Sequence, residues 1–408
     1  MNATDGRGVM DGQRFDDSAA GGRVLRVTVE RGDITVRAEL GARWTIAHDA
    51  SRGAVPEVER DGDTVCVTQR GHGRLDVTIT TPDLEQVDLR TGAGRVEASG
   101  TRGRARLVNG YGTVALHGAG GEAEIDTGAG DVDVEGFDGV LTASSGKGRV
   151  RIARLEGRAT LSTGAGVVEI QDTEAQVRAS SGSGDLALAR VGGAAELTTG
   201  HGAVLIQDPR DLSARVTTAM GAITVVDGSA RDLRLKSMMG EVRCSAALAP
   251  GRYELETALG AVAVDLQDDV AARVEAHTSF GAVRSDFPLV RVGRSGPLGF
   301  GGARMVGSIG RGAALVDLAL RSSKGDITLN RRPAPAPAPD PAVWPIGEDA
   351  SPEPAGVQRR ASPLSPPSPA PPTPRDPRAQ NPTLAVLEAL ARGEISPAEA
   401  EDLLSRRA

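Results

Sequence analysis

The 408-residue sequence is poor in aromatic side chains, cysteine and long apolar runs. Aromatics make up only 2% of its residues, so a core built from rings is not available and few rings could stack on a sugar. Its two cysteines, Cys66 and Cys244, are too few for a disulfide framework and are typical of a reducing compartment. The formal charge of −7 is mild for this length, so it gives no electrostatic reason to expect a nucleic acid partner.

Signals for export and for membrane insertion are also missing. Residues 1–17 are polar and glycine-rich, without the apolar core of a signal peptide. No run approaches the roughly 18 apolar residues that a spanning helix needs. We therefore expect a soluble cytoplasmic protein with no transmembrane segment. Peripheral association with the cell envelope is compatible with the same features.

Glycine, in contrast, is abundant, with 53 residues, and it recurs with a fixed period. Seven glycines follow one another at steps of 18 residues, and most have another glycine two positions earlier. A fixed period of this length is typical of a repeat architecture. The seven are Gly94, Gly112, Gly130, Gly148, Gly166, Gly184 and Gly202.

The positions between these glycines alternate in polarity. When each glycine is counted as position 1, positions 3 and 5 are apolar in every repeat, and positions 12 and 14 are apolar again. Position 8 is often apolar (Phe137, Leu155, Val191), which suggests a third inward corner. Alternation predicts strands, and glycine permits the turns between them. The pattern predicts an all-β, single-chain β-solenoid, similar to a parallel β-helix, with about 18 residues per rung.

We divide the chain into five parts. Residues 1–21 are expected to be disordered, 22–90 to form an irregular β cap, and 91–330 to form the solenoid repeats. A proline-rich linker follows over 331–382, and a two-helix hairpin over 383–408. This hairpin is too small to be stable alone, so it should dock on a copy of itself, on the solenoid or on another protein. Its apolar face would consist of Leu384, Leu387, Leu390, Leu403 and Leu404.

Beyond Gly202 the period lengthens and the residue before each turn glycine becomes bulky. Stacked, these residues would form an apolar stripe along one outer edge. The favoured interpretation is that residues 287–320 fold back and cover the stripe, because large exposed apolar patches are unusual in monomers. The alternative is an edge that binds a partner. A last repeat-like strand at 323–329 is expected to close the solenoid. The stripe residues are Met220, Met239, Leu259 and Phe280.

The sequence predicts no catalytic or ligand-binding site. The Gly-x-Gly units lead into strands, whereas a dinucleotide site needs a following helix. The five histidines share no repeat position, which argues against a metal cluster. Cys244 occupies an inward position, where a buried structural thiol is expected. Outward carboxylates alternate with arginines and do not cluster. We therefore predict no enzyme activity, no cofactor, no metal and no small-molecule ligand.

Two resemblances add to this interpretation. The repeated Thr/Ser-Gly-x-Gly-x-Val-x-Val units, with the lead-in at 76–82, resemble the bacterial putative-adhesin β-strand-repeat family, a domain of unknown function. The likeness covers about residues 23–330 and implies the solenoid fold, with a link to envelope stress or surface regulation. The tail, with Gly393-Glu394-Ile395-Ser396-Pro397, resembles the short helical module called SHOCT. That resemblance implies oligomerisation or contact with a protein partner.

Three functions remain open from the sequence. The first is a non-enzymatic scaffold whose tethered tail recruits partners or copies of the chain. The second is a cytoplasmic structural polymer similar in kind to the bactofilins. The third is a β-helix enzyme that acts on polysaccharides. Filaments that persist without residues 333–408 would favour the polymer, whereas self-association that requires the tail would favour the scaffold. Glycan hydrolysis abolished by one carboxylate substitution would favour the enzyme.

Overall fold

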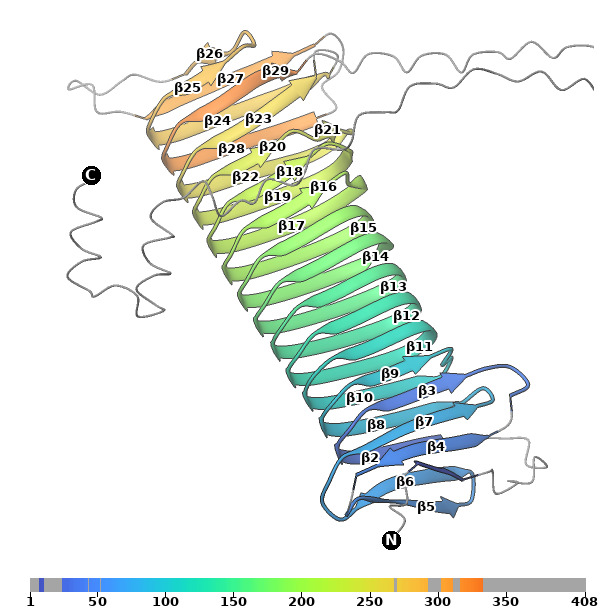
Figure 1. The fold of residues 1–408 in the computed structure, drawn as a ribbon. Helices are drawn as coiled ribbons and strands as arrows, with labels where there is room; N and C mark the ends of the chain where they lie inside the picture. The colour runs from blue at the N-terminus through green and yellow to red at the C-terminus, as the bar shows by residue number, and fades with distance from the viewer. Residues whose placement is uncertain are drawn as a thin grey trace, which may run out of the picture. The chain divides into compact units, whose positions relative to one another are not determined.

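The computed structural model describes residues 7–10, 24–42, 44–51, 53–267, 270–292, 302–310 and 316–332. The fold of this part is an all-β, single-chain β-solenoid of about 10 turns with ~18 residues per turn (Figure 1). The predicted fold class is thereby confirmed for the repeats. The linker beyond Arg332 and the predicted hairpin over 383–408 lie outside the described residues. Of residues 1–21, only β1 (Arg7–Met10) is described, and it pairs antiparallel with β4 (Thr45–Ala50).

The central rungs are long strands that stack in parallel with a shift of one repeat. Val132 is paired with Val150 and Leu141 with Ala159, so like positions lie one strand spacing apart, roughly 4.8 Å. Phe137 and Leu155 are 2% and 1% exposed, which confirms position 8 as a third inward corner. Each 16-residue strand continues through the bend at that corner. These strands are β11 (Val114–Ala129), β12 (Val132–Lys147), β13 (Val150–Ala165), β14 (Val168–Ser183) and β15 (Leu186–His201).

Further along the chain the rungs consist of shorter strands. Irregular register between β15 and β17, and again between β17 and β19, accommodates the longer repeats. The added residues therefore leave the inward alternation intact. The strands are β16 (Val204–Gln207), β17 (Arg210–Met220), β18 (Ile223–Val226), β19 (Ser229–Met239), β20 (Val242–Cys244) and β21 (Ala247–Leu248).

A column of buried polar side chains, threonine or serine at every position but Asn109, stands three residues before each turn glycine. Most of them donate to a glycine carbonyl, but Thr127 Oγ1 and Thr163 Oγ1 have no hydrogen-bond partner among the described residues. The Thr199 hydroxyl donates to the Gly184 carbonyl at 3.0 Å, and Thr257 donates to Gly240 at 2.9 Å. Each bond joins the end of one rung to the turn at its start, where the glycine carbonyl would otherwise be buried without a partner. Twelve members of the column are buried: Thr91, Asn109, Thr127, Ser145, Thr163, Ser181, Thr199, Thr218, Ser237, Thr257, Thr278 and Ser322.

At the N-terminal end of the solenoid, the rungs do not follow the order of the sequence. β2 (Val24–Arg31) lies between β6 (Thr64–Arg70) and β8 (Gln86–Ala93), parallel to both. β3 (Ile34–Ala38) lies in the same way between β7 (Leu75–Thr81) and β9 (Val96–Ser99), and β10 (Arg104–Tyr111) continues from β8. Antiparallel strands β4 and β5 (Val55–Asp61) pair with β7 and β6. The first strands after residue 23 thus form an internal rung.

The C-terminal end repeats this arrangement. β28 (Val316–Lys324) lies between β22 (Gly251–Leu259) and β24 (Ala272–Phe280). β29 (Ile327–Arg332) lies between β23 (Val262–Gln267) and β25 (Val283–Ser285). β27 (Ala303–Ile309) and β26 (Val290–Arg291) form an antiparallel cap on β24.

The prediction that 323–329 closes the solenoid is therefore wrong, because this strand belongs to an inserted rung. The reason is physical. The inward residues Leu318, Leu320 and Leu329 form the same apolar pattern as any other rung, so they fit equally well between two rungs or at the end. A repeat pattern identifies a rung but not its place in the stack.

Candidate functional site

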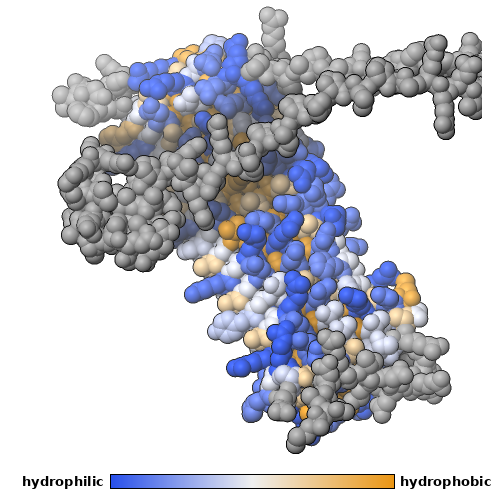
Figure 2. All heavy atoms as spheres, in the orientation of Figure 1, coloured by the Kyte–Doolittle hydropathy of each residue, from blue (hydrophilic) through white to orange (hydrophobic). Residues whose placement is uncertain are grey.

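The predicted apolar stripe is exposed. Met220, Met239 and Leu259 are 37%, 44% and 44% exposed, and they stack in register at the ends of β17, β19 and β22. Each one precedes a turn glycine, where the strand leaves the sheet and the side chain cannot reach the core. On the face drawn in Figure 2, hydrophilic residues predominate and hydrophobic areas are small.

The inserted rung interrupts the stripe. Lys324 is paired with both Leu259 and Phe280, so it stands between them in the stack. The prediction that four apolar residues stack without a break is therefore wrong, because β28 separates β22 from β24. Phe280, 61% exposed, lies beyond the lysine.

The favoured expectation that residues 287–320 cover the stripe is wrong for the part of that segment that the structure describes. Phe287 is 6% exposed and Leu289 packs against the core, while β26 and β27 form the cap on β24. Residues 293–301 and 311–315 of that segment lie outside the described residues. The four stripe residues keep 37% to 61% of their surface exposed.

Met238 also belongs to this surface and was missed from the sequence. It is 58% exposed and lies beside Met239 at the position where the central repeats have the first glycine of each pair. Loss of that glycine was the available signal. The other predicted interaction residues, Leu384, Leu387, Leu390, Leu403 and Leu404, lie outside the described residues.

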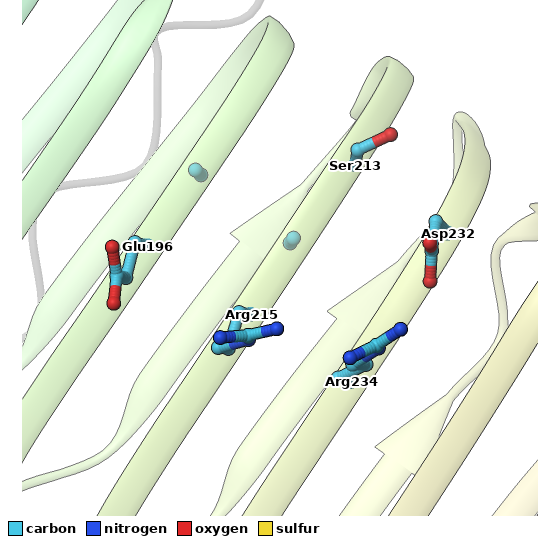
Figure 3. Close-up of a pocket in the computed structure, with 7 residues that line it drawn as sticks. Glu196, Ser213, Arg215, Asp232 and Arg234 are labelled. Carbon is cyan, nitrogen blue, oxygen red and sulfur yellow. The ribbon is translucent and has the colours of Figure 1, made fainter.

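A polar hollow on the same strands was not predicted (Figure 3). It has a volume of about 280 Å³ and is lined by Ala195, Glu196, Ser213, Ala214, Arg215, Asp232 and Arg234, which we call the arginine hollow. Arg215 on β17 and Arg234 on β19 are neighbours in register. A second hollow of about 460 Å³ adjoins it and shares Ala195 and Glu196. Small side chains at these positions leave room between the flanking arginines.

The charged residues at the arginine hollow are not all paired with a residue of opposite charge. The Arg178 guanidinium donates to Glu196 at 3.0 and 2.6 Å, so this carboxylate is already engaged from the preceding rung. Within the described ranges, neither Arg215 nor Arg234 has an ion pair. Asp232 Oδ1 is buried and has no hydrogen-bond partner among the described residues. The hollow therefore presents two arginines that form no ion pair among the described residues, next to a buried carboxylate oxygen.

The buried reactive side chains have structural roles. Cys244 is 1% exposed on β20, and burial raises the pKa of its thiol to about 11. Burial also raises the pKa of Tyr253, whose hydroxyl lies 2.5 Å from the Ala230 carbonyl and 2.7 Å from that of Ala249. Across the described residues, no group of three or more His, Cys, Asp or Glu could hold a metal ion.

The state of Cys244 leads to a prediction about thiol chemistry. At pH 8 a thiol with a pKa of about 11 is protonated, and the thiolate is the nucleophile, so native Cys244 should not react with iodoacetamide. Half-buried Cys66 should react in the folded chain. Mass spectrometry of the alkylated peptides checks this, with urea-unfolded protein as the control in which both should react. Alkylation of native Cys244 as fast as Cys66 would contradict it.

The fold is that of an all-β solenoid built from repeats. A family model described as Toastrack DUF4097 matches residues 160–330, from β13 to β29. The matched segment is thus similar to a family of β-repeat domains of unknown function, over a shorter range than the resemblance noted from the sequence. The SHOCT-like resemblance of the tail stays a prediction.

Other comparisons add little. A search of curated proteins finds no match. A solved structure titled as a putative cell adhesion protein from Clostridium sporogenes ATCC 15579 matches at 8% identity and a TM-score of 0.15. The match covers 76% of this chain and 94% of that chain, but so low a TM-score supports no statement about this chain. Over the part of the chain that the structure describes, no helix is long and apolar enough to cross a membrane.

Proposed function

We propose that this chain is a non-enzymatic β-solenoid scaffold that binds a protein partner through the apolar stripe. The exposure of Met220, Met239 and Leu259, three neighbouring large apolar residues, is the observation that carries the proposal. Exposed apolar surface of this kind marks interaction sites, and stacked rungs hold such a surface rigid. The family resemblance suggests a role in envelope stress or surface regulation.

The tail supplies a second interaction element in this proposal. Residues 333–382 contain 17 prolines, and a segment of this composition favours extended conformations that could span on the order of 150 Å. The leucine pattern over 383–408 then suits self-association or recruitment of a partner. The bactofilin-like polymer is less well supported, because antiparallel strands pair with terminal rungs at both ends of the solenoid. The polysaccharide enzyme is less well supported, because outward carboxylates of the described rungs pair with arginines on neighbouring rungs.

The test is the solution mass of the full chain and of a chain that ends at Arg332. The end point is Arg332 because β29 extends to this residue, whose Nη2 lies 3.0 Å from Asp227 Oδ1. We expect a defined oligomer for the full chain and a monomer for the shorter one, measured by light scattering. Filaments that persist in the shorter chain would support the polymer instead.

Substitutions in the apolar stripe distinguish association through the stripe from association through the tail beyond Arg332. If the chain ending at Arg332 still associates, Met239→Ser with Leu259→Ser should abolish that association. Leu205→Ser is the matched control, because Leu205 is 40% exposed on β16 but lies outside the stripe. If the full chain and the chain ending at Arg332 are both monomers, the protein does not self-assemble. The partner would then be a different protein. Equal effects of Leu205→Ser and the stripe variant would contradict a role for the stripe.

A further inference from the structure

Charged side chains on neighbouring rungs of the solenoid pair with opposite sign. Arg106 and Glu124 are 3.5 Å apart, and Arg178 and Glu196 are 2.6 Å apart, each pair joining two adjacent strands. Both pairs belong to the same repeat column. Such pairs stabilise a sheet, whereas like charges directly opposite one another destabilise it.

Arg215 and Arg234 continue this column but have the same sign, and Glu254 follows Arg234 in register without forming an ion pair with it. Glu196, the acidic neighbour of Arg215, is engaged by both Nε and Nη2 of Arg178. No ion pair of either arginine is present in the described part of the chain. Two arginines thus extend into the arginine hollow from strands whose backbones are about 4.8 Å apart, and each guanidinium has five donors. An anionic group bound between them would remove the repulsion.

The charge at the hollow indicates which anion fits. Arg215, Arg234 and the neighbouring Arg178 are balanced by Glu196, Asp232 and Glu254, the last paired in register with Arg234. A site with no excess of positive charge suits a singly charged carboxylate better than a doubly charged phosphate. Arginine also binds carboxylate with two parallel hydrogen bonds. Ala195 and Ala214 provide apolar surface for the methylene stem of an acidic side chain.

The surroundings favour a protein as the source of this carboxylate. Arg215 and Met220 lie on the same strand, five residues apart, which corresponds to roughly 16 Å. The two residues are an odd number of positions apart, so a partner must follow the corner at the end of β17 to contact both the hollow and the apolar stripe. The described residues that line the two hollows include no aromatic side chain on which a sugar ring could stack.

We infer that the arginine hollow is a binding site for a carboxylate side chain of the protein partner, an inference that rests on the proposed scaffold function. Arg215 and Arg234 donate hydrogen bonds to the carboxylate from adjacent rungs. Asp232 limits the affinity of the site by offsetting part of its charge. The apolar stripe supplies affinity, and the arginine pair selects partners that place an acidic residue at the required distance.

The experiment measures binding of poly-L-glutamate to the full chain by calorimetry at low ionic strength. Replacing both arginines, Arg215→Gln with Arg234→Gln, should weaken binding about tenfold, because the charge-assisted bonds are lost. Asp232→Asn should strengthen it about threefold, because a nearby like charge is removed. Arg104→Gln is the matched control, since Arg104 is an exposed arginine paired with Glu122 at 2.8 Å, and it should leave binding unchanged.

Several outcomes would overturn the inference. Unchanged binding in the double variant would do so, provided that circular dichroism shows the variant folded. If the double variant does not fold, a failure of Asp232→Asn to strengthen binding decides against the site instead. Inorganic phosphate bound through the same arginines more tightly than poly-L-glutamate would overturn the carboxylate assignment. Polygalacturonate bound there in place of poly-L-glutamate would identify a glycan and overturn the protein source.

Failure of this inference and failure of the proposed function give different results. If the chain ending at Arg332 associates and the stripe substitutions abolish that association, while poly-L-glutamate binding is independent of the arginines, only the carboxylate site fails. If the chain ending at Arg332 associates equally with and without the stripe substitutions, while poly-L-glutamate binding requires both arginines, the scaffold proposal loses its support and the anion site stays.

Discussion

A chain that ends at Gly310 is expected to lose its C-terminal rungs, whereas a chain that ends at Arg332 should keep the stability of the full protein. The missing strands, β28 and β29, have five inward side chains that are at most 2% exposed: Val316, Leu318, Leu320, Ile327 and Leu329. At about 2 kcal/mol for each buried side chain, their loss removes roughly 10 kcal/mol. It also removes the hydrogen-bonding partner of β22 on one side and of β24 on the other.

Hydrogen exchange measured by mass spectrometry tests this expectation. In the chain that ends at Gly310, residues 251–285 should exchange rapidly, while the rungs from β11 to β15 stay protected. The loss of protection from exchange is expected to stay local, because each rung of a solenoid contacts only its neighbours. The chain that ends at Arg332 is the control.

Direct pairing of β22 with β24 would contradict the expected loss of the C-terminal rungs. β22 and β24 pair with β28 in the same register, since Tyr253 and Val274 both face Leu318. Without β28 the two strands could pair directly and form a solenoid that is one rung shorter. Full protection of 251–285 would show that this repacking occurs and that the inserted rung is dispensable.

The sequence predicted the rungs and their register well, because glycine spacing and apolar alternation are local properties. Val132 and Val134 could be assigned to the core from their own repeat alone. The position of a rung in the stack depends on which other rungs it contacts, and the inward pattern of β28 is the same as that of its neighbours. For this reason the interruption of the stripe by Lys324 could not be predicted.

The arginine hollow could be predicted only in part. The repeat columns place Arg215 next to Arg234, so their juxtaposition was available from the sequence. The ion pair between Arg178 and Glu196 could not be predicted from the sequence. Glu196 has an arginine on each neighbouring rung, and only the side-chain conformations determine which of the two it pairs with. Exposure of Met238 likewise depends on where the strand turns away from the sheet.

Gly184→Ala is expected to destabilise the solenoid by about 3 kcal/mol or more, since it combines backbone strain with a steric clash. Gly184 has φ 153°, and a Cβ atom built there would lie 1.9 Å from the Gly166 carbonyl oxygen and 2.6 Å from its carbon. Both are backbone atoms of the neighbouring rung, so relief requires the rungs to separate. Thermal unfolding followed by circular dichroism provides the measurement, with a lower Tm as the expected result.

Gly118→Ala measures the cost of alanine at a positive φ where no clash occurs. Gly118 has φ 56° and no atom within 4 Å of the added Cβ. The equivalent positions of later repeats already hold Arg154 and Asp172, with φ 54° and 50°. Alanine at 118 should therefore cost about 1 kcal/mol. Equal losses at 118 and 184 would mean that the clash at 184 adds nothing to the cost of a positive φ. A much larger loss at 184 would mean that the φ of 153° and the close stacking of the turns together require the 18-residue glycine period.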